Sequence, residues 1–184
     1  MPHMSAPVIG KLALGGIMNF DDVIKNMFAE RLFDPLAWFA HSRALVGSAR
    51  ISKEQADKLI SPLEKSELEN VCSLLYGLAL ENLFKAVWVY QKFGSLSYES
   101  PLPNPEFPNQ IKTHDLLKLA KLVDSELATK YEMSLKLLTE ATTWAGRYPC
   151  SIKGDEGTII RMPSIHNHAE EMYAKHRKIF TISS

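Results

Sequence analysis

The stretch LENVCSLLYGLALENLFKAVWVY, residues 68–90, decides the fold of this chain. Its apolar side chains cover most of the circumference at helical spacing, so it predicts a helix that is buried on several sides. A helix buried in this way lies at the centre of a domain, with other helices packed around it. Gly94 predicts that the helix ends after Phe93. Its few polar residues include Asn82 and the pair Glu81 and Lys85, which stand four residues apart in the favourable order.

Shorter helical patterns lie on both sides of this stretch. The central helix has two alternative capped starts, at Ser61 or at Ser66, and the sequence leaves both open. Before the central helix, we expect helices over residues 20–32, from Pro35 onward, and over residues 52–60, where Ser52 begins a capping box. After it, we expect helices from Thr113 onward, over residues 131–146 and over residues 164–180.

Strand signals are scarce, and most of the connections between these segments are short. The sequence therefore predicts an all-α fold, an antiparallel helical bundle around the long central helix. A small β-hairpin is expected near residues 150–162, around a Gly-Asp-Glu-Gly turn. Residues 95–112 carry four prolines and are predicted to form a loop. We expect one domain over residues 18–184, preceded by an N-terminal arm over residues 1–17.

The composition is that of an ordinary globular protein, with 46% hydrophobic residues, 23% charged residues and a net charge of +0. This balance argues against a nucleic-acid binder that relies on a strong overall positive field, although a local basic patch stays open. The cysteines, Cys72 and Cys150, do not form a disulfide framework, which favours a reducing, cytoplasmic compartment. The sequence contains no uninterrupted run of about 18 apolar residues, so no membrane-spanning helix is predicted. No cofactor is indicated.

The densest group of metal-ligating residue types is in the last predicted helix. His166, His168, Glu170 and Glu171 offer imidazole and carboxylate groups. However, His166 and His168 do not share a helical face, and no Cys-x-x-Cys pair accompanies them. We therefore interpret these residues as a solvated polar face and predict no metal site.

Two positions at predicted helix ends are candidates for ligand binding. His114 follows a capping threonine and either belongs to the capping structure or binds an anion beside exposed amides. Arg147 closes a helix, where a cation complements the helix dipole or presents a guanidinium group to a phosphate or a carboxylate. Arg161 and His166 form a third candidate, because such a pair can bind phosphate and transfer a proton in RNA cleavage.

Three short motifs resemble those of the HEPN-domain proteins, the higher eukaryotes and prokaryotes nucleotide-binding family. YGLALENLFKA at 76–86 is similar to their central helix, and THDLLKL at 113–119 resembles the start of the following helix. WAGRYP at 144–149 resembles a helix ending of uncharacterised bacterial members. The resemblance covers roughly residues 68–150, a little under half of the chain.

The resemblance implies an antiparallel helical bundle that forms homodimers, in a family whose members often act in prokaryotic defence or toxin–antitoxin systems. Ribonuclease members use an arginine followed by a histidine after four to six residues. Arg147 matches that arginine, but residues 148–153 contain no histidine, and Pro149 breaks the helix.

These observations lead to one main functional hypothesis and one alternative. The leading hypothesis is a dimeric HEPN-like protein that binds a nucleotide, RNA or a protein partner through His114, Arg147 and Tyr148, without catalysis. The alternative is a metal-independent endoribonuclease with a rearranged site, in which Arg147, Arg161 and His166 act on the phosphodiester.

Overall fold

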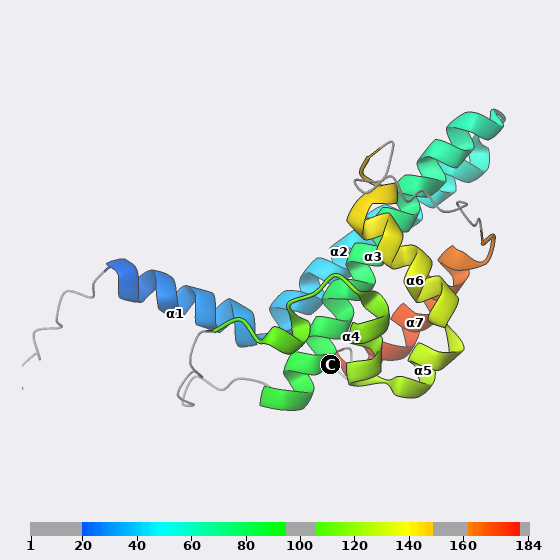
Figure 1. Ribbon diagram of the computed structural model, residues 1–184. Coiled ribbons are helices and arrows are strands. Elements are labelled where there is room, and N and C mark those ends of the chain that lie inside the picture. The colour runs from blue at the N-terminus through cyan, green and yellow to red at the C-terminus, as the bar shows by residue number, and fades with distance from the viewer. Residues whose placement is uncertain (1–19, 95–105, 149–161, 181–184) are drawn as a thin grey trace, which may run out of the picture.

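The protein was analysed as a computed structural model, which describes residues 20–94, 106–148 and 162–180 (Figure 1). Within these ranges it contains helices and no strand, which confirms the all-α class predicted from the sequence. The predicted N-terminal arm lies outside the described residues. The predicted β-hairpin over 150–162 also lies outside them, except for its last residue.

The central helix is α3, Pro62–Phe93, which contains 32 residues. Its start is the first of the two alternatives, because the Ser61 hydroxyl accepts a hydrogen bond from the Glu64 N–H. It ends where predicted: the Gly94 N–H donates to the Tyr90 carbonyl at 2.8 Å, and Gly94 has a φ of 68°. This left-handed conformation favours glycine, since other residues meet a steric penalty there.

The second half of α3 is buried on all sides. Every residue from Leu83 to Val89 is buried, which requires neighbours around the whole circumference. Along its whole length, α3 packs against α2 (Pro35–Lys58), α4 (Leu116–Val123), α6 (Glu132–Glu140), α7 (Ile165–His176) and the short segment η2 (Ala141–Ala145). By length and composition α3 could also cross a membrane, and 67% of its most apolar window is buried inside the protein. Packing within the fold thus buries most of its apolar surface.

Helix α2, Pro35–Lys58, forms a hairpin with α3 through a connection of three residues (Figure 1). The Ser42 hydroxyl donates to the Ala79 carbonyl at 2.7 Å within this interface. The sequence analysis was wrong to expect a separate helix over 52–60, because α2 continues through Ser52 without a break. Ala56 is fully buried in the last turns of α2, and this packing outweighs the local capping signal.

Helix α1, Phe20–Phe33, projects from the body of the protein beside the end of α3 (Figure 1). Its last turns bury Ala29, Leu32 and Phe33, and the Phe33 ring lies 4.7 Å from the Phe93 ring. The other described elements are η1 Asn109–Ile111, α4 Leu116–Val123, α5 Ser125–Lys130, α6 Glu132–Glu140, η2 Ala141–Ala145, α7 Ile165–His176 and η3 Arg177–Ile179.

Two local predictions after α3 need correction. Asp115, not Thr113, is the N-cap of α4, because its carboxylate accepts from the Lys118 N–H at 3.0 Å. The helix predicted over 131–146 is α6 followed by η2, which is a π-helical turn. Such turns lie outside the 3.6-residue periodicity on which the prediction rested. Helix α5 was not predicted, because six residues are too few to show a periodic pattern.

Candidate functional site

A buried ion pair lies on α3, near the middle of the fold. The Lys85 ammonium donates to Glu81 Oε1 at 2.7 Å, and both residues are 6% exposed. Charges withdrawn from water in this way need partners, because leaving one unpaired costs several kcal/mol. The face of the Trp38 ring lies 5.7 Å from the Lys85 nitrogen and adds a cation–π contact. The pair is therefore compensated inside the protein.

His114 completes this group, which we call the α3 cluster (Glu81, Lys85 and His114). Its Nδ1 lies 3.0 Å and 3.1 Å from the two Glu81 carboxylate oxygens. An ionised carboxylate only accepts hydrogen bonds, so Nδ1 must carry the proton. The imidazole side chain is nevertheless 69% exposed. Its Nε2 is therefore the nitrogen left for a ligand.

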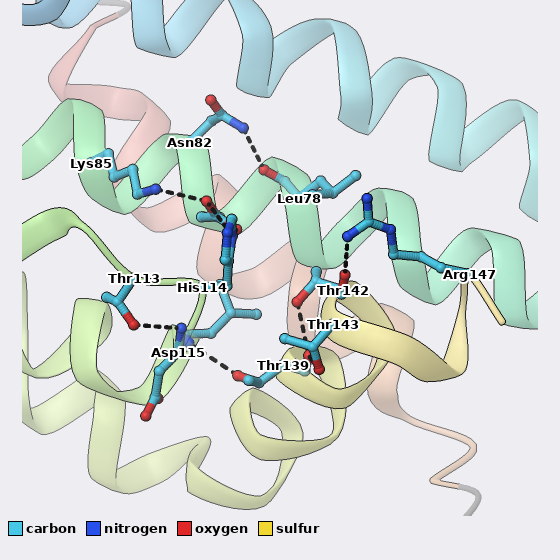
Figure 2. A network of polar contacts seen from close by, with 12 residues as sticks. Leu78, Asn82, Lys85, Thr113, His114, Asp115, Thr139, Thr142, Thr143 and Arg147 are labelled. Carbon is cyan, nitrogen blue, oxygen red and sulfur yellow. Dashed lines mark hydrogen bonds and ion pairs between the residues drawn. The ribbon is translucent and has the colours of Figure 1, made fainter. Parts of the chain in front are cut away.

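Two threonines fix the segment that carries His114 (Figure 2). The Asp115 N–H donates to the Thr113 hydroxyl oxygen at 3.1 Å, and the Leu116 N–H donates to the Thr139 hydroxyl oxygen at 3.0 Å. Thr139 belongs to α6, so this second bond joins the start of α4 to a neighbouring helix. The backbone on the C-terminal side of His114 is thereby anchored, which limits the positions that its ring can take.

Arg147 lies two residues after the π-helical turn η2. The Gly146 N–H donates to the Ala141 carbonyl at 3.1 Å, a five-residue step that closes this turn. The Arg147 guanidinium donates to the Thr142 carbonyl at a long 3.4 Å, and its carbon lies 6.0 Å from the centre of the Tyr148 ring. Arg147 and Tyr148 are both exposed. The guanidinium group therefore has donors left for a ligand.

Two glycines allow the segment that precedes Arg147 to pack closely against α3. A Cβ on Gly77 would clash with the Thr142 methyl carbon and would lie 2.9 Å from the Leu138 carbonyl oxygen. A Cβ on Gly146 would lie 2.7 Å from the Leu74 Cβ. The end of α6 and the turn before Arg147 thus pack directly on the backbone of α3, which requires residues without side chains at both positions.

His114 and Arg147 lie along one side of α3 (Figure 2). His114 contacts Glu81, and the residue before Arg147 lies against Leu74, seven residues earlier on the same face of the helix. Seven residues correspond to about 10 Å along a helix axis. One extended ligand can span such a separation. The structure thus brings together two of the residues that the sequence analysis selected from different segments.

The alternative pair is arranged differently. His166 is 6% exposed, its Nε2 lies 2.9 Å from the Ser73 hydroxyl oxygen, and its ring stacks on Tyr76 at 5.4 Å. Burial lowers the pKa of His166 and so favours the neutral ring. Arg161 lies outside the described residues. A catalytic role for His166 would require this packing to open, whereas His114 is already accessible.

The other polar residues of α7 point to separate partners. His168 Nδ1 lies 2.7 Å from the Ser134 hydroxyl oxygen. Glu170 accepts two hydrogen bonds from Arg50, at 2.8 Å and 2.7 Å, and Glu171 accepts a short hydrogen bond from the Tyr131 hydroxyl. Each of the four side chains considered for a metal therefore already has a protein partner. Among the described residues, no group of three metal-ligating side chains is found.

No established family profile, curated protein or solved structure matches this chain.

The sequence indicated His114 and Arg147 as candidates, but it did not reveal that Glu81 contacts His114. Glu81 and Lys85 were interpreted as a helical ion pair, and their joint burial and their contact with His114 were not predicted. A signal was present, because two charged residues stand inside the most apolar stretch of the chain. Charged residues are rarely buried without a partner, so this position indicates a polar contact from another segment.

Proposed function

We propose that this protein is an HEPN-like antiparallel helical bundle that forms a homodimer and binds the phosphate of a nucleotide or of RNA without cleaving it. The α3 cluster carries the proposal. The buried Glu81 carboxylate binds the His114 ring at Nδ1, which leaves Nε2 for a ligand. The His114 side chain is 69% exposed. When protonated, this nitrogen donates a hydrogen bond to a phosphate oxygen, and when neutral it accepts one from a ligand hydroxyl or amine.

Arg147 supports the same proposal. Its guanidinium group fits phosphate oxygens, with which it can form two parallel hydrogen bonds. The exposed Tyr148 ring beside it offers an aromatic face on which a base can stack. The missing histidine after Arg147 is the reason for proposing binding without catalysis. The motif resemblance supports the homodimer and favours a defence or toxin–antitoxin context.

A binding measurement with matched variants tests this proposal. Fluorescence anisotropy of a labelled single-stranded RNA of mixed sequence gives the affinity, and unlabelled nucleotides serve as competitors. Losing one charge-assisted hydrogen bond should weaken binding about tenfold in His114→Gln and in Arg147→Gln. The exposed residues His41 and Arg31 provide controls, and His41→Gln and Arg31→Gln should bind as the wild type does.

Two results would overturn the proposal. One is equal RNA affinity of the wild type and Arg147→Gln at low ionic strength. The other is RNA cleavage, followed on a gel under the same conditions, that disappears in Arg147→Ala. That second result would favour the endoribonuclease alternative instead.

A further inference from the structure

The Trp38 side chain on α2 contacts both the end of α1 and the α3 cluster. It is half-buried, and its indole N–H donates to the Leu32 carbonyl of α1 at 2.9 Å. The face of the same ring lies 5.7 Å from the Lys85 nitrogen of α3. One side chain therefore joins three helices, and one of its contacts belongs to the candidate ligand site. The sequence analysis did not select it.

The contact with α1 fixes the direction of the indole ring. Leu32 belongs to the last turn of α1, where the backbone carbonyls have no partner within the helix. The indole nitrogen is a donor only, so it supplies that carbonyl with a hydrogen bond. The Trp38 and Phe107 rings also pack in a T-shaped arrangement, with their centres 6.2 Å apart. Since the indole ring cannot turn without losing these contacts, its face stays directed at Lys85.

The contact with Lys85 matters because the Lys85 ammonium is buried. A charge withdrawn from water needs compensation, and Glu81 provides part of it. The negative face of an indole ring attracts a cation, and this attraction is stronger where water is excluded. Lys85 is 6% exposed, so the ring face takes the place of water on one side of the ammonium. Without the ring, water would reach the ammonium and draw it outward.

Glu81 transmits the position of Lys85 to His114. Its Oε1 accepts from Lys85 at 2.7 Å and also lies 3.1 Å from His114 Nδ1, while Oε2 lies 3.0 Å from the same nitrogen. Because the carboxylate and the ammonium attract each other, a displaced Lys85 would draw Oε1 away from His114. The hydrogen bond at one ring nitrogen decides which nitrogen of a neutral imidazole carries the proton. The position of Lys85 thus helps to decide that Nδ1 carries it and that Nε2 is left for a ligand.

We propose that Trp38 is a positioning residue of the phosphate site proposed above. Its ring holds Lys85 beside Glu81, and the Glu81 carboxylate then sets the tautomer of His114. Trp38 does not touch the phosphate and acts only through His114. The effect on ligand binding rests on the proposed function, whereas the effect on the His114 ring is measured without a ligand.

Long-range proton–nitrogen correlation spectra of the isotope-labelled full chain measure the tautomer. At about pH 8, above the ordinary pKa of a histidine, they show which ring nitrogen carries the proton. The His114 signals are those that disappear in His114→Gln. The wild type should show mainly the Nδ1–H form, and this form should no longer be the main one in Trp38→Leu. Trp38→Phe keeps an aromatic face and should retain the Nδ1–H form.

Two further proteins serve as a control and as a milder change. Phe180→Leu removes another half-buried ring that packs on the core, and it should leave the His114 tautomer unchanged. A fluorinated tryptophan at position 38 keeps the shape of the ring but weakens its negative face, so it should lower the Nδ1–H fraction without disturbing the fold. An unchanged His114 tautomer in Trp38→Leu or, where that variant does not fold, in the fluorinated protein would overturn the proposal.

The binding assay with labelled RNA tests whether Trp38 acts through His114. Trp38→Leu should weaken binding by up to about tenfold, the effect expected of His114→Gln. Trp38→Leu combined with His114→Gln should bind no more weakly than His114→Gln alone, because the residue through which Trp38 acts is already gone. Combined with Arg147→Gln, the loss should add to that of Arg147→Gln. Additive losses in the combination with His114→Gln would indicate general loosening of the fold and overturn the proposal.

The two measurements separate this inference from the proposed function. If His114→Gln weakens RNA binding and Trp38→Leu changes neither the tautomer nor the affinity, Trp38 is not a positioning residue and the proposed function stands. If Trp38→Leu changes the tautomer but the wild type binds no RNA, the proposed function fails and Trp38 remains a positioning residue of the His114 ring.

Discussion

The α3 cluster and the ion pair between Arg50 and Glu170 place charge in opposite environments. In the α3 cluster, an acid and a base are buried together, and an exposed histidine shares the acid. Arg50 and Glu170 join α2 to α7 in a partly exposed contact, with side-chain exposures of 47% and 32%. Buried charges must be balanced within the fold, whereas exposed ones are solvated and need not be. Removing one partner should therefore cost more stability in the α3 cluster than at the Arg50–Glu170 pair.

The largest expected effect comes from breaking the balance of the α3 cluster. In Lys85→Met the Glu81 carboxylate keeps its hydrogen bond with His114 but loses its buried counter-charge. We expect the free energy of unfolding to fall by about 3–5 kcal/mol, because an uncompensated charge is left in the core. Urea unfolding followed by circular dichroism measures this. Lys118→Met, which removes an exposed lysine of α4, should change stability by less than about 0.5 kcal/mol. A loss below about 1 kcal/mol in Lys85→Met would show that the pair is not buried as described.

An intermediate effect is expected at Glu170, the acid of the α2–α7 contact. Its hydrogen bond with Arg50 holds the pKa of this carboxyl below its usual range. The folded state then binds its proton more weakly than the unfolded chain does. The resulting stability is fully present above the pKa that this carboxyl has in the unfolded chain, and it is lost as the pH falls through the lower pKa of the folded state.

The corresponding variant is Glu170→Gln, which should lower stability by about 1 kcal/mol at pH 7 because this ion pair is only partly buried. The difference in the free energy of unfolding between the wild type and Glu170→Gln should decrease as the pH falls from about 5 to 3. Urea unfolding at each pH measures it. Glu132→Gln at a fully exposed ion pair is the matched control and should change the pH profile much less. A difference that stays constant with pH would contradict the assignment.

The smallest effect on stability is expected at Arg43, which is exposed on α2. Arg43→Gln removes a solvated charge, so its stability should stay within about 0.5 kcal/mol of the wild-type value. Urea unfolding followed by circular dichroism checks this. A loss above about 1 kcal/mol would mean that Arg43 is a structural residue.

Sequence reasoning succeeded where a local pattern was long or chemically distinctive. The central helix and its end at Phe93 followed from residues 68–94, since an apolar circumference and a terminal glycine leave little choice. It failed where packing overrode a local signal. Ser52 carries a good capping box, yet α2 continues through it because Ala56 is buried further on.

The α3 cluster and the Arg50–Glu170 pair differ in the same way. His114 and Arg147 were visible as candidates, because each stands at a predicted helix end. The contact between Arg50 and Glu170 was not visible, because these residues are 120 positions apart in the sequence. Their contact depends on how α2 lies against α7. No local pattern specifies such a register.

The sequence by itself determined the all-α class and the end of the central helix at Phe93, and it selected His114 and Arg147 as residues near helix ends. These features depend on periodicity and capping, which act over one or two helical turns. Only the tertiary structure decided that Glu81 contacts His114, that His166 is buried and that Arg50 pairs with Glu170. Those outcomes depend on which helix surfaces are in contact, because burial and the distance between charges are set by packing between segments far apart in the chain.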